Sequence, residues 1–458
     1  MHKFSAVVLF GAVILAAGCG SGNGGSNPPP PPPTAGCTTS GASSQSAAAS
    51  NTAIAVSAPN VASLIVDGGP KNNYANGLFT TVTVCVPGTV TGCQTIDHVL
   101  VDTGSFGLRL LVGPPSSAAG GQLTLALPAE SDGVGPLAEC AQFSDGITWG
   151  AIRKADIYIG GPNTNNMSGE VAPNVPMQVI GDSSVGAPPS GCTKFGTPED
   201  TLSTLLANGI LGVGPYPQDC GNGCVTSSSA GLYYHCPSSG CVESAVSLDK
   251  QVINPVAAFV ATGAGVPDNN GVIVELPAIG SGGAATVSGS LVFGIGTQSN
   301  NGLGGATVYT ADPSTGNITT VFAQKPYSNS FIDSGSNGYF FLNSTSTNIP
   351  TCTSNSNAPG FYCPTTTLSC SAVNQGTNGT QGTVNFTVAN ANSLVQTGNS
   401  AFDDLAGPNN PPPNPGGGSP PPTGFDWGLP FFYGRNVYTG IAGMPDANGN
   451  PQQPFFAY

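Results

Sequence analysis

Short runs of alternating apolar and polar residues dominate the chain from Val61 onward, and Gly, Pro, Asn and Ser separate them. Because side chains in a β-strand point alternately to opposite faces, this period of two predicts strands with one buried face. The clearest runs are at 62–67, 78–86, 96–101, 151–159 and 288–296. Helical periodicity is confined to short stretches within 201–217 and 254–262. We therefore expect an all-β protein with a few short helices.

Two stretches share one order of residues: an apolar approach, an Asp, a hydroxyl residue, a Gly, a Ser and a second apolar run. The first, at 96–111, is centred on Asp102-Thr103-Gly104-Ser105, and the second, at 330–342, on Asp333-Ser334-Gly335-Ser336. One Asp on a Gly-containing turn is usually no more than a capped turn. Two copies, each following a β-type run, indicate two similar half-molecules that each deliver one carboxylate to a shared site.

The first 60 residues have a different composition from the rest. A short basic start and an apolar run within 1–18 predict a signal peptide, since the run is too short to span a bilayer. Cys19 follows in a sequence similar to a bacterial lipoprotein box, so we expect lipidation of Cys19 and attachment to a membrane surface. An ordinary cleaved signal is the alternative. The Gly, Ser and Pro residues of 19–60 predict a tether without a fold.

Composition narrows the functional classes. The chain has 458 residues, of which 66 are Gly, 42 are Pro and only 7% are charged, as expected for many short strands joined by turns. Nine Lys and Arg residues and a net charge of −14 leave no basic patch for a phosphate backbone, so we expect no nucleic-acid partner. Few charges suit acidic surroundings, and they suit equally an exported protein with a neutral surface.

Thirteen cysteines, one of them Cys19, predict an oxidising compartment and up to six disulfides. The close pairs are the first candidates: Cys85 and Cys93, Cys220 and Cys224, Cys236 and Cys241, and Cys363 and Cys370. Cys220, Cys224, Cys236 and Cys241 also have spacings that zinc sites use. Their Gly- and Ser-rich surroundings favour disulfide-closed loops instead, and we expect no metal.

Three further segments have a recognisable local pattern. Residues 142–161 predict a hairpin that turns at Ser144-Asp145-Gly146 and returns along a long strand. Such a hairpin can fold over a site or lie at a sheet edge. Residues 351–382 are polar and Cys-bearing, and residues 406–424 are rich in Pro and Gly, so we expect both to be loops.

With these elements in place, the chain resembles the pepsin-like aspartic peptidases from about Val61 to its C-terminus. Asp102-Thr103-Gly104-Ser105 and Asp333-Ser334-Gly335-Ser336 match the two catalytic loops of that family. The landmarks between and after them follow the family's order: a flap strand at 149–161, a segment behind the first Asp at 208–217, a lobe-closing strand at 289–294 and a segment behind the second Asp at 428–432. The chain differs where Phe143 replaces the usual flap Tyr and Arg109 replaces a supporting Trp.

The resemblance implies a bilobal fold with a first lobe at 61–303 and a second at 304–458. It implies a catalytic dyad, Asp102 and Asp333, on turns allowed by Gly104 and Gly335. Four hydroxyls would support the dyad: Thr103 and Ser334 would join the loops, and Ser105 and Ser336 would bond the outer carboxylate oxygens. Phe143, Asp145 and Gly146 would form the lid.

These features imply a monomeric aspartic endopeptidase of the cell envelope that hydrolyses peptide or protein substrates without a cofactor. The alternative is a catalytically silent module of the same fold that captures peptide, protein or glycan at the cell surface.

Overall fold

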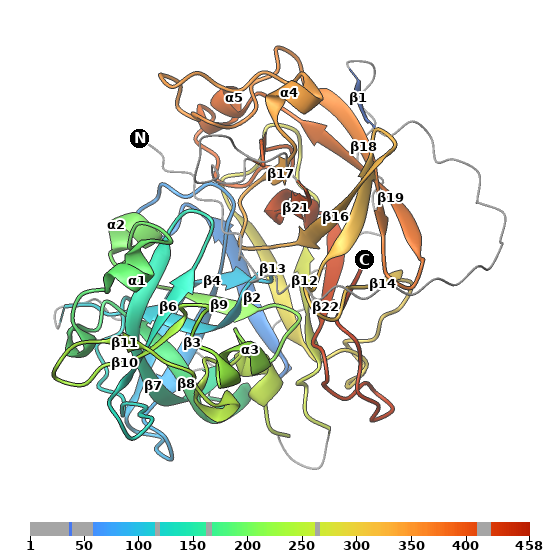
Figure 1. Cartoon of the computed structure of the whole chain (residues 1–458). Coiled ribbons are helices and arrows are strands. Elements are labelled where there is room, and N and C mark those ends of the chain that lie inside the picture. The colour runs from blue at the N-terminus through green and yellow to red at the C-terminus, as the bar shows by residue number, and fades with distance from the viewer. Residues whose placement is uncertain (1–35, 39–57, 115–119, 162–166, 262–265, 410–422) are drawn as a thin grey trace, which may run out of the picture.

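The computed structural model describes residues 36–38, 58–114, 120–161, 167–261, 266–409 and 423–458. Within these ranges the protein is mostly β-structure, arranged in two sheets with few short helices, which confirms the all-β prediction (Figure 1). The expected signal segment, Cys19 and most of the expected tether lie outside the described residues.

The larger sheet has 15 strands and contains the first Asp motif. In spatial order its strands are β11 (Val242–Glu243), β10 (Tyr233–His235), β6 (Leu137–Gln142), β7 (Ile147–Ile159), β8 (Glu170–Ile180), β5 (Phe106–Leu111), β9 (Gly209–Val213), β4 (Cys93–Asp102), β3 (Gly77–Cys85), β2 (Val61–Asp67), β13 (Val287–Phe293), β12 (Gly271–Leu276), β22 (Arg435–Gly440), β23 (Phe455–Ala457) and β14 (Val308–Thr310). Three of these strands, β14, β22 and β23, come from the sequence that follows residue 304, so this sheet combines strands from both halves of the sequence.

The smaller sheet has eight strands and carries the second Asp motif. Its order is β1 (Gly36–Thr38), β18 (Leu368–Gln375), β15 (Ile318–Phe322), β16 (Lys325–Ile332), β21 (Phe425–Trp427), β17 (Tyr339–Phe341) and β20 (Ala406–Gly407), with β19 (Gln381–Val388) paired to β18.

The helical segments are all short. The α-helices are α1 (Ser190–Thr193), α2 (Leu202–Leu205), α3 (Asn222–Thr226), α4 (Ser344–Thr347) and α5 (Ala391–Val395), and the 3-10 helices are η1 (Ser183–Val185), η2 (Leu248–Lys250), η3 (Pro255–Ala258) and η4 (Leu429–Phe431). In the described part of the chain, none has the length and hydrophobicity that a bilayer crossing requires.

The two Asp motifs occupy corresponding places in two similar strand arrangements. Asp102 ends β4, which runs parallel to β9, and β9 runs antiparallel to β5, the strand that follows the motif. Asp333 follows β16, which runs parallel to β21, and β21 runs antiparallel to β17. A further parallel partner flanks each arrangement, β8 beside β5 and β20 beside β17. The internal repeat seen in the sequence is therefore also a repeat of strand pairing.

Aromatic side chains fill the core beneath the second motif. Phe425 and Trp427 of β21 pack against Phe341, Phe386 and Tyr339, with ring centroids 5.2 to 5.7 Å apart. Pairs of aromatic rings at these distances stabilise the folded state by more than the burial of their apolar area alone. This packing fixes β21 behind the strand that delivers Asp333.

Three expectations about loops were wrong in part. The segment 351–382 contains β18, whose Cys370, Ala372 and Val373 are buried and which pairs with β19 over its whole length. The segment 406–424 begins with the buried strand β20, while 410–422 lies outside the described residues. The expected tether contains β1, which pairs with β18.

The structure contains six disulfides, which supports an oxidising compartment. The predicted pairs Cys85–Cys93, Cys220–Cys224 and Cys236–Cys241 are confirmed, so four cysteines with zinc-like spacing are bonded to each other. The predicted pair of Cys363 and Cys370 is wrong.

Strand register explains that error. Cys370 lies on β18 directly opposite Cys37 of β1 and bonds to it. Cys363 bonds to Cys352, because backbone hydrogen bonds from Cys352 to Phe361 and from Cys363 to Pro350 bring the two cysteines together. The short separation of Cys363 and Cys370 in the sequence therefore gave no information on the true partner of either cysteine.

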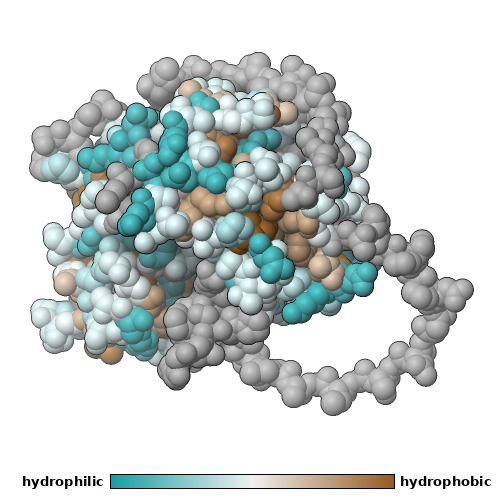
Figure 2. All heavy atoms as spheres, turned by 90° about the horizontal axis from the view of Figure 1, so that it is seen from above, coloured by the Kyte–Doolittle hydropathy of each residue, from teal (hydrophilic) through white to brown (hydrophobic). Residues whose placement is uncertain are grey.

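One face of the molecule is mostly hydrophilic. On the face drawn in Figure 2, teal and pale residues cover most of the described surface, with smaller groups of brown residues among them.

Buried carboxyl groups predict a stability that falls as the pH rises. Burial raises the pKa values of Glu170, Glu275 and Asp404 to about 7. The charge of Asp268 adds to the effect on Glu170, and the charge of Asp403 adds to the effect on Asp404. A carboxyl in the unfolded chain titrates near pH 4, so the folded state binds these protons more tightly. Their stabilisation is complete below about pH 4 and is lost as the pH rises through 7.

We expect the free energy of unfolding to fall by about 1 to 3 kcal/mol per group between pH 5 and pH 8. Melting temperatures measured across that range check this, and Glu275→Gln should flatten the dependence. A melting temperature that rises toward pH 8 would contradict it.

Candidate functional site

The two motif aspartates meet at one point between the sheets. The backbone N–H of Gly104 donates to Oδ1 of its own Asp102 at 2.8 Å and to Oδ1 of Asp333 at 3.1 Å. One donor therefore touches an oxygen of each carboxyl, although the residues are 231 positions apart in sequence. Both side chains are fully buried, with 0% of their surface exposed.

Hydroxyls next to the aspartates join the two loops. The Thr103 hydroxyl donates to the carbonyl of Ile332 at 3.1 Å, and the Ser334 hydroxyl donates to the carbonyl of Val101 at 2.7 Å. In return, the N–H of Ser334 donates to the Thr103 oxygen at 2.9 Å, and the N–H of Thr103 donates to the Ser334 oxygen at 3.2 Å. In these four buried bonds, each loop donates one hydroxyl bond and one N–H bond to the other loop. Together they fix the distance between the carboxyls.

Each carboxyl also has a serine on its outer side. Ser105 donates to Oδ2 of Asp102 at 2.5 Å, and Ser336 donates to Oδ2 of Asp333 at 2.7 Å. The inner oxygens face Gly104 and the outer oxygens face these serines. Both carboxyl groups are thus held in defined orientations.

Glycine is required on both loops because the opposite carboxyl lies against the backbone. A Cβ placed on Gly104 would lie 2.6 Å from Cγ of Asp333, and one on Gly335 would lie 2.6 Å from Cγ of Asp102. These distances are shorter than real Cβ contacts. The Gly in each motif therefore permits the approach of the two acids.

The electrostatics of the pair follow from its burial. Burial raises the pKa of Asp333 well above its ordinary value, and the neighbouring charges of Asp102 and Asp426 raise it further. Like charges at this distance cannot both ionise in a low dielectric, so the pair holds one proton over a wide pH range. Such a pair combines a carboxylate that accepts a proton with a carboxylic acid that donates one.

Asp426 is a third carboxyl beside the pair that the sequence pattern did not single out. It lies on β21, is 1% exposed, and neither of its oxygens has a hydrogen-bond partner. Burial raises its pKa well above the ordinary value, while the nearby Ser336 hydroxyl lowers it. The signal in the sequence was a single acid inside the apolar run 425–432.

The predicted hairpin exists as β6 and β7, joined by a turn in which Phe143 N–H donates to the Gly146 carbonyl at 2.8 Å. Phe143 is buried in a cluster with Tyr74, Leu205 and Ile210. The backbone of Ile147 is bonded to the segment 197–199: its N–H donates to the Thr197 carbonyl, and its carbonyl accepts from the Glu199 N–H. The Cys140–Cys192 disulfide attaches β6 to α1. The hairpin is thus fastened to its neighbours on the side of 190–200.

Tyr74 connects the hairpin turn with the aspartates. It is 4% exposed, and its ring packs edge-on against Phe79 with centroids 5.7 Å apart. Burial raises the pKa of Tyr74, and the charges of Asp145, Glu199, Asp102 and Asp333 raise it further. Its phenol is therefore influenced by the charges of both the turn and the pair. No sequence pattern pointed to Tyr74, because it stands in a loop outside both motifs.

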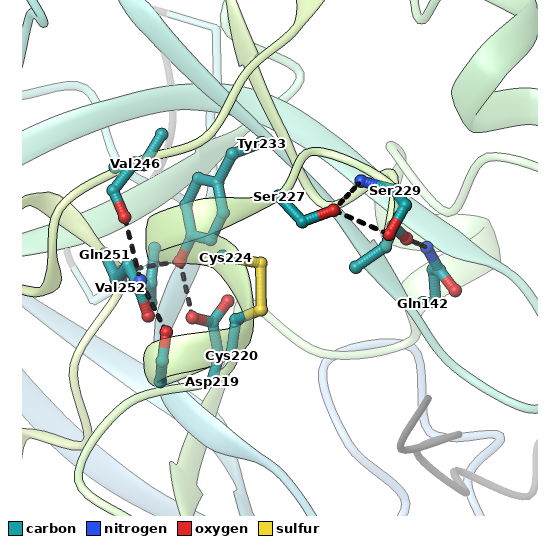
Figure 3. Close-up of a disulfide and its surroundings, with 12 residues drawn as sticks. Gln142, Asp219, Cys220, Cys224, Ser227, Ser229, Tyr233, Val246, Gln251 and Val252 are labelled. Carbon is teal, nitrogen blue, oxygen red and sulfur yellow. Dashed lines mark hydrogen bonds between the residues drawn. A yellow bond between two sulfur atoms is a disulfide. The ribbon is translucent and has the colours of Figure 1, made fainter. Parts of the chain in front are cut away.

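Arg109 forms a buried ionic cluster beside the hairpin. Its Nη2 lies 2.5 Å from Oε1 of Glu139 on β6 and 3.5 Å from Oδ2 of Asp219. Tyr233 donates to Asp219 at 2.5 Å, next to the Cys220–Cys224 disulfide (Figure 3). Arg109 also lies 5.8 Å from the centre of the Phe143 ring. Arg109 therefore contacts both the hairpin and the loop that carries the disulfide.

Two carboxyls face one guanidinium in this cluster. Burial raises the pKa of Asp219 well above the ordinary value, and the Glu139 charge adds to it. The cluster therefore keeps a proton under conditions in which an exposed Asp would be ionised. Arg109 stands where the resemblance implies a Trp and fastens β5 to β6 by charge.

The close approach of the loops predicts a large effect of a single methyl group. Gly104→Ala and Gly335→Ala should each reduce the free energy of unfolding by about 1 to 3 kcal/mol or more, because the carboxyls cannot move apart without breaking the loop bonds. Gly280→Ala is the matched control, since a Cβ there meets nothing within 4 Å, and should change stability by less than about 0.5 kcal/mol. Chemical denaturation measures all three. Equal stabilities would show that the loops are not closely packed.

The Arg109 cluster predicts a strong penalty when its cation is lost. Arg109→Met should cost about 3 to 5 kcal/mol of stability at pH 7, because it leaves buried carboxyls unpaired. The triple variant Arg109→Met, Glu139→Gln, Asp219→Asn should recover most of this loss.

Arg153→Met is the control for the Arg109 variants, since the Arg153–Asp182 pair keeps contact with solvent, and it should cost less than about 1 kcal/mol. Equal losses in Arg109→Met and Arg153→Met would contradict the role of burial.

Comparison with known proteins gives a family without a described activity. A search of curated proteins finds no match. A family model described as "Protein of unknown function (DUF3443)" matches residues 56–458, which contain both Asp motifs, the hairpin and all of the disulfides except the bond to Cys37. This match covers most of the chain, and the protein therefore belongs to that family.

Proposed function

We propose that the protein is an aspartic endopeptidase with Asp102 and Asp333 as its catalytic dyad. The observation that carries the proposal is the Gly104 N–H that bonds an inner oxygen of each carboxyl. Two buried acids held this close, each with its own serine, form the arrangement that peptide hydrolysis by an activated water requires.

The proposed fold is that of the pepsin-like peptidases, with a first lobe at 61–303 and a second at 304–458. Its support is the repeated strand arrangement, in which β4, β9 and β5 correspond to β16, β21 and β17. The order of landmarks along the chain supports it independently.

The mechanism follows from one proton shared by two acids. A water between the inner oxygens loses a proton to the ionised carboxyl as it attacks the peptide carbonyl, and the protonated carboxyl donates to the developing oxyanion. Collapse of the tetrahedral intermediate returns a proton to the leaving amine. The chemistry forms no covalent intermediate with the protein and uses neither metal nor cofactor.

Substrate access requires a movement, because neither carboxyl has exposed surface. The β6–β7 hairpin, with Phe143, Asp145 and Gly146 at its turn, is the proposed lid. Asn337, directly after the second motif, is fully buried with neither end of its amide bonded. An amide in that state can pair with the backbone of an extended peptide once the lid opens.

The proposed location is the cell envelope, anchored to the outer membrane through lipidated Cys19, with secretion as the alternative. Six disulfides support an oxidising environment, and the pKa values near 7 of Glu170, Glu275 and Asp404 favour acidic surroundings. The proposed substrate is peptide or protein, and the proposed active form is a monomer.

The competing proposal is a silent module that binds peptide, protein or glycan without turnover. The observation that favours it is the complete burial of both carboxyls beneath a hairpin fastened by Cys140–Cys192. Against it, a binding module has no need for two intact, mutually bonded Asp motifs.

Replacement of either acid tests the two proposals. Asp102→Asn and Asp333→Asn should each lower kcat/KM for a peptide substrate at about pH 4 by at least about 1,000-fold, because the one carboxyl that remains cannot both accept the water's proton and donate to the oxyanion. Cleavage of an unfolded protein substrate, followed by mass spectrometry, measures this.

The exposed Asp446→Asn is the control and should retain the wild-type rate. Turnover that survives in Asp102→Asn would contradict the dyad. Tight peptide binding by the wild type without any cleavage would favour the silent module.

A further inference from the structure

Asp426 is a buried acid that the mechanism above does not use. It lies in the middle of β21, between Phe425 and Trp427, whose rings pack into the aromatic core. Because side chains alternate along a strand, Asp426 points to the other face of the sheet. Its register partners there are Phe331 on β16 and Phe340 on β17. A carboxyl with two phenylalanines as strand neighbours is costly to ionise.

The same strand is bonded directly to the second Asp motif. Asp333 N–H donates to the Trp427 carbonyl at 3.0 Å, and Leu429 N–H donates to the Ser336 carbonyl at 2.7 Å. The Ser336 hydroxyl donates to Oδ2 of Asp333 at 2.7 Å and also influences Asp426. Ser336 therefore bonds the outer oxygen of Asp333 and also acts on the unbonded Asp426 carboxyl.

The first half of the molecule has no acid at the position that corresponds to Asp426. In its parallel strand pair, Asp102 lies opposite Gly212, and Ile210 lies two positions before that glycine. Asp426 likewise lies two positions before Gly428, in the strand paired with the approach to Asp333. The position that holds Ile210 in the first half therefore holds an acid in the second half, while the two serines bond their own aspartates in the same way. The two halves of the repeat differ in polarity at this position.

We propose that Asp426 is a positioning residue of the second catalytic loop: in its protonated form it donates to the Ser336 hydroxyl oxygen and so holds the Ser336 proton on Asp333. This proposal rests on the proposed peptidase function. The chain of donors runs from Asp426 through Ser336 to Asp333 and moves no net charge. Loss of the Asp426 proton removes the donor to Ser336, so the Ser336 proton is no longer held on Asp333 and activity falls.

Other titratable groups on the packed elements do not face Asp426. On β16, Lys325 is exposed and the Tyr327 ring contacts Phe425 on the opposite face. On β17, the Tyr339 ring contacts Trp427, also on the opposite face. Asp333 and Asp102 are the charged groups that act on Asp426. The ionisation of Asp426 is therefore coupled to the dyad.

The kinetic test uses the full protein and the pH dependence of kcat and KM for a peptide substrate. Asp426→Asn keeps an N–H donor that does not titrate, so activity at low pH should stay within about 3-fold of wild type and the alkaline limb should move to higher pH. Asp426→Leu removes the donor and should lower kcat about 10-fold with little change in KM, because Asp426 does not touch substrate. Glu275→Gln, which removes another buried acid with an unbonded oxygen, should leave the profile unchanged.

A spectroscopic readout separates this proposal from the proposed function. The infrared difference between wild type and Asp426→Asn at pH 7 should contain the carbonyl stretch of a protonated carboxyl. In Ser336→Ala that stretch should shift, because its hydrogen-bond acceptor is gone. An inactive wild type with both signals present would refute the peptidase function alone. An alkaline limb that Asp426→Asn leaves in place, an absent carboxyl stretch or a stretch unaffected by Ser336→Ala would overturn the role of Asp426.

Discussion

Two acids buried side by side are the constraint on which the rest of the structure depends. Carboxyl groups repel each other when ionised and lose solvation when buried, so their approach needs compensation from fixed donors. The backbone N–H of Gly104, the hydroxyls of Ser105 and Ser336, and the crossed bonds of Thr103 and Ser334 provide it. Each donor sits on a turn whose position is set by a parallel strand pair behind it.

Further acids are buried elsewhere in the protein. Asp426 lies behind the second loop, and the Glu139 and Asp219 carboxyls share Arg109 beside the hairpin. Burial raises the pKa values of Asp333, Asp219 and Asp426, so the folded state retains protons that an unfolded chain would release. A molecule of this kind is better suited to acidic than to alkaline conditions, in agreement with its low content of charged residues.

The sequence predicted those features that depend on local pattern and failed at those that depend on register. Alternation identified most strands, and the repeated Asp motif identified the two residues that the structure brings together. Three short-range disulfides were predictable, but the partners of Cys363 and Cys370 were not, because strand pairing brings Cys37 and Cys352 to them. Asp426 and Tyr74 escaped notice for the same reason. Neither belongs to a motif, and only the packing of β21 and of the loop before β3 places them near the dyad.

If Asp102 and Asp333 form one catalytic unit, one molecule of a transition-state mimic should block each protein molecule, and active-site titration measures this. A statine-type peptide, which mimics the tetrahedral intermediate, is added in steps to the protein at about pH 4 while cleavage of a peptide substrate is followed. A single dyad should cleave the substrate before addition and lose its rate linearly, to zero at one equivalent of inhibitor. Cleavage that persists beyond one equivalent, or no cleavage before the inhibitor is added, would contradict it.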